Sequence, residues 1–333
     1  MEKPTIAITM GDPAGIGPEL VVKVLSQAAS LQSCRPLVIG DLPVMQAAVE
    51  LVKSPIRFRQ ISAVDAAAYA WPEIDLLRPA GLNVGPAPVG QVDPQMGKAA
   101  AACLQLSAEL ALSGKIQGLV SAPLNKEAFH KAGFEYRDEL AYLADLTHSP
   151  STFIVGVMKQ LWTITITEHV ALKDVAAQIT KENVLQAIQF FDQLLVARGE
   201  RQPRIAVAAL NPHSGDGGLM GREEIDAIRP AVEAAKAAGI NAAGPFPADT
   251  IFPMALQGAF DGVVGMYHDQ ANIARKLQPK EESATLFMGL PFACGTTAHG
   301  TAFDKAGQGI SDPGSLDLAL RCVIQLAQGG SVV

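Results

Sequence analysis

Leu161-Trp-Thr-Ile-Thr-Ile-Thr167 is a short run rich in β-branched residues, which predicts a buried parallel strand. Two further short runs, which are aliphatic and also predict buried strands, are Arg204-Ile-Ala-Val-Ala-Ala-Leu210 and Asp261-Gly-Val-Val-Gly-Met266. A histidine follows each run, and the three are His169, His213 and His268. In open α/β sheets, ligands bind beyond the carboxyl ends of the strands, so we expect the three imidazoles to converge. Three imidazoles can hold a metal ion and leave coordination positions for water or substrate.

Strand and helix signals alternate along the rest of the chain. Further strands are expected at 5–9, 36–40 and 118–123, and helices from about Pro18 and over 96–113, 182–198 and 222–238. The segment 79–94 is rich in proline and glycine and predicts a loop. This alternation favours an α/β fold with a mostly parallel sheet covered by helices.

Composition restricts the class of protein. A chain of 333 residues favours two domains, and 49% hydrophobic with 18% charged residues is typical of a folded globular chain. The net charge of −7 disfavours nucleic acid or an anionic membrane as a main partner and leaves a small molecule. Scattered cysteines, the absence of an apolar leader and the lack of a membrane-spanning run predict a reduced, cytoplasmic protein.

The metal interpretation competes with a simpler one. A single histidine at a strand end is more often a hydrogen-bonded structural residue. The separations, 213 − 169 = 44 and 268 − 213 = 55, exclude a zinc finger or a helix-borne HExxH pair, so only the fold can bring these histidines together. We assign His130 and His148 to solvent or structure.

Two glycine-rich segments are candidates for binding a cofactor. Gly11-Asp-Pro-Ala-Gly-Ile-Gly-Pro-Glu19 lies between a strand and a helix, where glycines permit close approach and helix N–H groups favour an anion. It is equally typical of a structural turn. His299-Gly-Thr-Ala-Phe-Asp304 and the glycines after it form a second loop that could wrap a nucleotide.

Several phrases together resemble the 4-hydroxythreonine-4-phosphate dehydrogenase family of pyridoxal phosphate biosynthesis. In chain order they are Gly11 to Glu19, Ala122-Pro-Leu-Asn-Lys126, Leu210-Asn-Pro-His213, Pro247-Ala-Asp-Thr250, Tyr267-His-Asp-Gln270, Gly289-Leu-Pro-Phe292 and His299 to Asp304. The resemblance implies a two-domain α/β/α fold like that of isopropylmalate and isocitrate dehydrogenases. The first domain would be discontinuous, 1–125 plus 295–333, and the second would span 126–294. It also implies an active site in the interdomain cleft and a homodimer that shares residues of the site.

The resemblance assigns roles to particular residues. His169, His213 and His268 would bind a divalent metal; three imidazoles favour Zn²⁺, with Mg²⁺, Mn²⁺ and Co²⁺ as alternatives. NAD or NADP would be the cofactor, held by Gly15, Gly17, His299, Gly300, Thr301, Ala302 and Asp304. Lys126, Asp249 and Asp269 are candidates for the catalytic base, with no choice among them, and Lys276 would bind substrate.

The chain departs from the family where phosphate is bound. Family members use a histidine-threonine pair, a lysine, an asparagine and an arginine; the last two positions hold Thr285 and Cys294. The pair falls on Glu139 and Leu140, or on Arg137 and Asp138 after a two-residue shift. A thiol cannot replace an arginine fork, and a carboxylate repels phosphate. Near His268, Ala271 and Ala274 replace the usual glycine and proline, and Arg275 precedes Lys276.

The expected function is NAD(P)- and metal-dependent oxidation of the secondary alcohol of a small β-hydroxy acid, with decarboxylation. The substrate is expected to differ from the family's and to include non-phosphorylated acids. An alternative within the family is a cis-dihydrodiol carboxylate of aromatic acid degradation, of the terephthalate dihydrodiol type. A three-histidine metallohydrolase and a binding protein without catalysis are alternatives from other classes.

Overall fold

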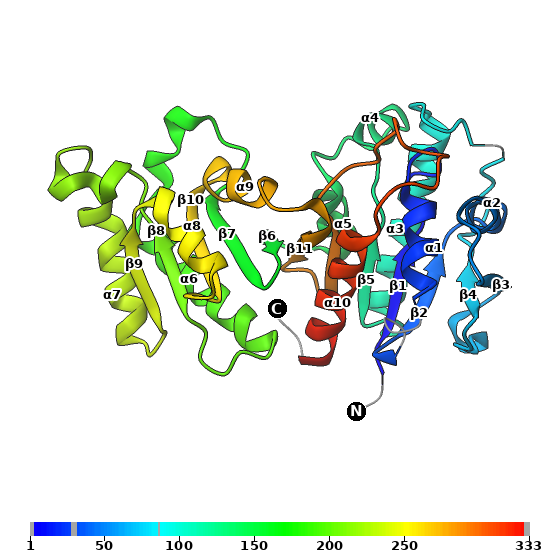
Figure 1. Ribbon diagram of the computed structural model, residues 1–333, viewed down its shortest axis with the longest axis horizontal. Coiled ribbons are helices and arrows are strands. Elements are labelled where there is room, and N and C mark those ends of the chain that lie inside the picture. The colour runs from blue at the N-terminus through cyan, green and yellow to red at the C-terminus, as the bar shows by residue number, and fades with distance from the viewer. Residues whose placement is uncertain (1–2, 28–31, 86, 330–333) are drawn as a thin grey trace. The chain divides into compact units, whose positions relative to one another are not determined.

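The structure is a computed structural model that describes residues 3–27, 32–85 and 87–329 (Figure 1). The chain divides into two compact units. Unit 1 consists of Met1–Thr152 and Ala284–Val333, and unit 2 of Phe153–Ser283. The sequence-based boundaries at 126 and 294 differ from these. The helices at 126–131 and 139–147 pack on the helix at 94–112, which belongs to unit 1, and they are therefore part of that unit.

Unit 1 contains a sheet in the order β3-β4-β2-β1-β5-β12-β11. Its strands are β1 (Thr5–Thr9), β2 (Arg35–Ile39), β3 (Arg57–Ile61), β4 (Glu73–Leu77), β5 (Gly118–Ser121), β11 (Ser283–Met288) and β12 (Ala293–Thr297). All neighbours are parallel except β11, which runs antiparallel to β12. The apolar residues Ile6, Ile8, Leu37 and Leu119 are almost completely buried, as expected for inner parallel strands.

Helices cover this sheet (Figure 1). They are α1 (Gly17–Leu25), α2 (Leu42–Val52), α3 (Pro94–Leu112), α4 (Lys126–Lys131), α5 (Glu139–Thr147) and α10 (Gly314–Gly329), with a 3₁₀ turn at Val64–Ala66. α1 packs on α2 and α10, whereas α3 packs on β1, β2, β5, α4 and α5. The predicted helices near Pro18 and over 96–113 are confirmed as α1 and α3, and the described part of 79–93 contains no helix or strand.

Unit 2, green to orange in Figure 1, has strand order β6-β7-β10-β8-β9. Its strands are β6 (Phe153–Met158), β7 (Leu161–Thr167), β8 (Ile205–Ala208), β9 (Ala242–Phe246) and β10 (Gly262–Tyr267). β6 forms an antiparallel pair with β7, and the other pairs are parallel. The strands expected before His169, His213 and His268 are therefore confirmed as β7, β8 and β10, and the α/β fold class is confirmed.

The helices of unit 2 are α6 (Lys181–Ala197), α7 (Arg229–Ala237), α8 (Ala248–Leu256) and α9 (His268–Lys276). Short 3₁₀ turns lie at Leu172–Asp174, Ala176–Gln178, Pro212–Gly218 and Lys280–Glu282. The predicted helix 222–238 begins instead as a π-helical turn at Glu224–Ile228 and continues as α7. It ends before Gly239, whose φ of +88° suits a helix-terminating glycine. No helix of the described residues is long and apolar enough to cross a membrane.

Candidate active site

The three predicted metal ligands follow three neighbouring parallel strands of unit 2. His169 lies two residues beyond β7, His268 directly follows β10, and His213 lies in the turn after β8. β10 pairs with both β7 and β8, so the carboxyl ends of the three strands lie at one edge of the sheet. The fold thus brings the three histidines to the same edge, as the sequence predicts.

His169 and His268 face each other at a distance suited to a shared ion. Their ring centroids are 5.7 Å apart. Two imidazoles that bind one Zn²⁺ through nitrogens at about 2.0–2.1 Å have ring centres roughly 5–6 Å apart. His268 Nδ1 donates a hydrogen bond to Asp269 Oδ1 at 2.7 Å, which leaves Nε2 as the nitrogen with a lone pair for a metal.

The third ligand is not assembled with these two. Within the described part of the chain, no three His, Cys, Asp or Glu side chains are grouped so that they could hold a metal ion. The residues present nevertheless fit a metal, because neutral imidazoles from adjacent strand ends are suitable donors. The role of His169, His213 and His268 as ligands remains a prediction.

His213 belongs to an unusual turn. Residues 213–217 all have positive φ, including 52° at His213 and 55° at Ser214. Such backbone is costly for residues other than glycine and persists only when the surroundings impose it. The turn therefore needs an anchor.

Glu224 supplies that anchor. Its side chain is 0% exposed. Oε1 accepts hydrogen bonds from Leu210 N at 2.9 Å and Asn211 N at 2.7 Å, and Oε2 accepts one from Asn211 Nδ2 at 3.0 Å. Glu224 thus fixes the chain immediately before His213. Sequence reasoning missed it, because an acidic residue eleven positions after a histidine (224 − 213 = 11) forms no recognisable motif.

Gln270 links two of the strand ends. Its Oε1 accepts a hydrogen bond from Met266 N at 2.8 Å, and its Nε2 donates to Ala209 O at 2.9 Å. Met266 lies in β10, and Ala209 directly follows β8. Gln270 therefore fixes the distance between the strands that carry His213 and His268. Its place in the phrase Tyr267-His-Asp-Gln270 was the only signal for it.

The remaining predicted residues of unit 2 are at its surface. Asp249 lies in the first turn of α8, Asp269 follows His268 in α9, and Lys276 ends α9; all three are exposed. Arg275 precedes Lys276, and its guanidinium donates a hydrogen bond to Asn272 Oδ1 within the same helix. Burial lowers the pKa of Arg275. The candidate base Lys126 is exposed at the start of α4 in unit 1.

In unit 1 the two predicted cofactor segments are in direct contact. Ile16 N donates a hydrogen bond to Thr301 O at 3.1 Å. A Cβ on Gly15 would lie 2.8 Å from Thr301 Cβ, so only glycine allows this approach. Gly15 and Gly17 are buried, Thr301 is 7% exposed, and Asp304 is exposed. His299, Gly300 and Ala302 complete the same loop. Whether these seven residues hold NAD(P) remains a prediction.

Helix α1 holds the second of these segments. Glu19 is 3% exposed; its Oε1 accepts from Gly307 N at 2.7 Å and its Oε2 from Gly309 N at 3.0 Å. Lys23 Nζ donates to Gly309 O at 2.8 Å and to Ser311 O. Two charged side chains one turn apart thus fix a loop nearly three hundred residues away in the sequence.

Glu19→Gln should destabilise unit 1 by about 1–3 kcal/mol, because one of the two loop amides would lose its carboxylate acceptor. Urea unfolding would measure this, and limited proteolysis should show earlier cleavage near residue 307. The exposed Glu50 in α2 provides a matched control, Glu50→Gln, which should change stability by less than about 0.5 kcal/mol. Equal stability of both variants would show that the two hydrogen bonds do not hold the loop.

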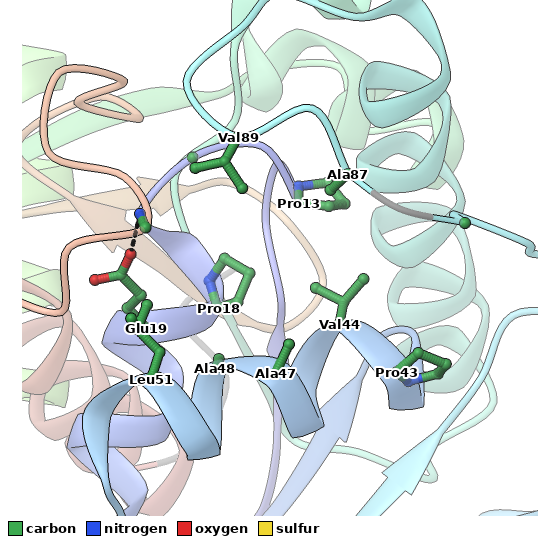
Figure 2. A pocket seen from close by; sticks show the side chains of 13 residues that line it. Pro13, Pro18, Glu19, Pro43, Val44, Ala47, Ala48, Leu51, Ala87 and Val89 are labelled. Carbon is green, nitrogen blue, oxygen red and sulfur yellow. Dashed lines mark hydrogen bonds between the residues drawn. The ribbon is translucent and has the colours of Figure 1, made fainter.

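A cavity of about 510 Å³ lies behind these segments. Figure 2 shows Val44, Ala47 and Leu51 of α2 directed toward Pro13 and Pro18. The lining is apolar, and its one charged residue, Glu19, is occupied by the loop amides. No cationic side chain of the described residues lines this cavity, and we assign no substrate or cofactor to it.

Glu139, at the start of α5, is the most unusual carboxyl group of unit 1. It is 7% exposed. Burial raises its pKa to about 7; a hydrogen bond with Ser121 opposes this rise, Asp138 adds to it, and Lys126 opposes it weakly. Nearby, burial raises the pKa of the Cys294 thiol well above its usual range, and the charge of Glu139 raises it further. Cys294 is therefore an uncharged thiol at neutral pH.

The residues adjacent to Glu139 cap the helix, form an ion pair or are buried. Asp138 Oδ1 accepts from Ala141 N at 2.8 Å as the N-cap of α5, and Arg137 is exposed and forms an ion pair with Asp138. Leu140 is 1% exposed and Thr285 is 9% exposed. Of the two registers considered for the histidine-threonine pair, one therefore presents a buried carboxylate and the other a helix cap. The choice between these registers remains open.

Asp12, in the glycine-rich turn, is a second buried carboxyl group. It is 0% exposed; Oδ1 accepts from Ala14 N at 2.8 Å, and Oδ2 has no hydrogen-bond partner among the described residues. Burial raises its pKa to about 6, partly offset by backbone hydrogen bonds from Ala14 and Asn125. The folded chain therefore binds a proton at Asp12 more tightly than the unfolded chain does.

This shift predicts a pH-dependent effect of Asp12→Asn. A raised folded pKa lowers stability as pH rises from about 4 to about 6, and the penalty is constant above that range. The variant should gain up to roughly 3 kcal/mol relative to the wild-type chain at pH 8 and little at pH 4. Urea unfolding at both pH values would test this. The same difference at both would contradict a charged, buried Asp12.

The chain matches one protein family along most of its length. The family model described as "Pyridoxal phosphate biosynthetic protein PdxA" matches residues 32–323. The D-threonate 4-phosphate dehydrogenase of Cupriavidus necator is 41% identical over 97% of each chain. A crystal structure of a 4-hydroxythreonine-4-phosphate dehydrogenase from Burkholderia phymatum is 39% identical, with a TM-score of 0.82, over 98% of this chain and 99% of that one.

A more distant likeness covers the same length. A terephthalate 1,2-cis-dihydrodiol dehydrogenase from Burkholderia xenovorans is 26% identical, with a TM-score of 0.67, over 97% of this chain and 98% of that one. All three relatives are named as dehydrogenases, and the chain is an enzyme of this class, an oxidoreductase acting on CH–OH groups. It belongs to the PdxA family, which confirms the resemblance found in the sequence.

Proposed function

We propose that the chain oxidises the secondary alcohol of a small β-hydroxy acid with NAD(P) and a divalent metal, with loss of CO₂, and that the substrate is not phosphorylated. The buried Glu139 and Cys294 carry this proposal. The resemblance aligns Cys294, and in one register Glu139, with residues that bind phosphate in the family. In its ionised form the buried Glu139 repels a phosphate dianion, and an uncharged thiol offers no cation. The names of these relatives specify phosphorylated acids. This chain would catalyse the same reaction on a substrate that lacks the terminal phosphate.

The proposed reaction is an oxidation of the alcohol followed by loss of CO₂. A base would remove the proton of the alcohol, and NAD(P), which the two glycine-rich segments of unit 1 would hold, would accept the carbinol hydrogen as hydride. The bond to the carboxylate then breaks, CO₂ departs, and the electron pair left on the substrate is protonated. A divalent metal held by His169, His213 and His268 would act as a Lewis acid that stabilises the negative charge developed in these steps. The base is Lys126, Asp249 or Asp269.

A matched substrate series tests this proposal. NADH formation would be measured with D-threonate and 4-hydroxy-L-threonine, and with their 4-phosphates, in the presence and absence of Zn²⁺, Mg²⁺ or Mn²⁺. We expect metal-dependent turnover that is faster without the phosphate. Faster turnover of the phosphorylated acids would overturn the substrate assignment and leave the reaction standing. If the chain neither binds NAD(P) in calorimetry nor reduces it, but hydrolyses a model ester, the three-histidine hydrolase is correct.

A second candidate substrate is a cis-dihydrodiol carboxylate, because the chain resembles a terephthalate dihydrodiol dehydrogenase along nearly its whole length. Such a substrate also carries no phosphate and also loses CO₂ on oxidation. Including it in the same assay distinguishes the two classes. We further propose a homodimer in the cytoplasm. Light scattering of the purified protein would test the dimer, and fractionation of cells would test the compartment.

A further inference from the structure

Glu139 has a carboxylate oxygen that lacks a donor. Its Oε1 is buried and accepts no hydrogen bond from any residue that the structure describes. A buried acceptor without a donor lowers stability, so native chains rarely retain one without a reason. The hydrogen bond with Ser121 leaves this atom unsatisfied. When Glu139 is ionised, a hydroxyl group of a bound molecule would supply the donor that this oxygen lacks.

The place of Glu139 in the fold indicates what kind of molecule supplies that donor. Ser121 is the last residue of β5, and Glu139 is the first of α5. The carboxyl ends of parallel strands are where α/β sheets bind ligands. Ser121 and β12 are also connected, because Thr296 Oγ1 donates to Ser121 O at 2.8 Å. Glu139 thus lies beside the carboxyl end of β5, at the kind of sheet edge where ligands bind in α/β proteins.

The charges around Glu139 favour a donor group over an anion. Lys126 is the cation that acts on it, and its influence is the smallest of the four that set its pKa. Asp138 adds a second negative charge, and the Cys294 thiol is uncharged. The oxygens of a phosphate are hydrogen-bond acceptors, and so is Glu139 Oε1, so the two would not pair. A hydroxyl group supplies the missing hydrogen without adding a charge to a buried place.

We propose that Glu139 determines substrate choice: its Oε1 accepts a hydrogen bond from an unmodified terminal hydroxyl, so the substrate is a short polyhydroxy acid. This inference rests on the proposed dehydrogenase function and names the substrate class of the same site. It makes Glu139 a substrate-binding residue that selects for a hydroxyl, in addition to repelling a phosphate.

The test compares three probes that differ only at their terminal carbon. They are D-threonate, its 4-deoxy analogue and D-threonate 4-phosphate. For the wild-type enzyme we expect kcat/KM with D-threonate to exceed that with the 4-deoxy acid at least tenfold, and the phosphate to be slowest. Glu139→Leu should abolish the preference for D-threonate, Glu139→Gln should keep part of it through its amide oxygen, and Glu127→Gln, an exposed control on α4, should keep all of it.

Equal use of D-threonate and the 4-deoxy acid would overturn this inference, as would an undiminished preference in Glu139→Leu. A merely structural Glu139 predicts a lower Tm in Glu139→Leu with equal losses on both acids. If no β-hydroxy acid yields NADH, the proposed function fails. The inference about Glu139 can then still be tested by measuring the binding of the same acids by calorimetry. If D-threonate does not bind, the inference is wrong. Tighter binding of 4-amino-4-deoxy-D-threonate than of D-threonate would replace the hydroxyl by an ammonium group and refute the proposal as stated.

Discussion

Replacing His268 with alanine should lower metal-dependent dehydrogenase activity roughly 10³-fold or more. Lewis-acid stabilisation by a bound metal is worth several kcal/mol, and each 1.36 kcal/mol is a factor of ten in rate. His268 Nδ1 is engaged by Asp269, so its Nε2 is the nitrogen available to a metal. Removing it leaves His169 without the imidazole whose ring lies 5.7 Å away. Calorimetric titration with Zn²⁺ should show weaker binding in parallel with the loss of activity.

His148 provides the matched control. It is exposed and is the C-cap residue that follows α5, with a φ of 53°, a conformation that asparagine tolerates. His148→Asn should therefore keep both the activity and the affinity for Zn²⁺. Removing the metal from the wild-type enzyme with a chelator should reproduce the His268→Ala phenotype, and adding metal back should reverse it. Full activity of His268→Ala, or of the chelated enzyme, would eliminate the three-histidine site.

Glu224→Ala should destabilise the protein by about 3–5 kcal/mol. Three donors, namely the amides of Leu210 and Asn211 and the Asn211 side chain, would lose the carboxylate to which they donate. Each buried donor left unsatisfied costs about 1–3 kcal/mol. The turn that carries His213 has strained backbone and would lose its anchor. Urea unfolding would measure the change.

The same substitution should affect the metal site. Groups that orient metal ligands typically contribute 10- to 100-fold to metal affinity, and we expect a loss of that size for Zn²⁺ in Glu224→Ala. Asp226→Asn is the control, because Asp226 forms only an exposed ion pair with Arg222. A destabilised variant that binds Zn²⁺ as well as the wild-type chain would show that the turn does not position a metal ligand.

Much of unit 2 could be predicted from its strand sequences. β7 is rich in β-branched residues, and β8 and β10 are short runs of mainly apolar residues and glycine; such runs indicate buried strands. The direction of β6 and β11 could not be predicted. Whether a strand pairs parallel or antiparallel depends on the partner that tertiary packing places beside it, and no local pattern records that partner.

The candidate site was predictable where chemistry is visible in the residue type. Histidines at strand ends and glycines in a strand-to-helix turn can be recognised in a sequence. Glu224, Gln270 and Glu19 act through hydrogen bonds to backbone groups that are distant or irregular, so their roles require coordinates. The burial of Glu139 also could not be predicted. Glutamate is usually a surface residue, and only the packing of α5 shows that this one is buried.

The discontinuity of unit 1 affects the order in which the chain can fold during synthesis. Unit 2 is continuous, so it is complete once residue 283 has left the ribosome. The sheet of unit 1 still lacks β12 at that moment, and the edge of β5 that will pair with it is unprotected. Glu19 and Lys23 also wait for residues 307–311. Strand β5 and helix α1 are thus made early but are among the last elements to reach their final partners.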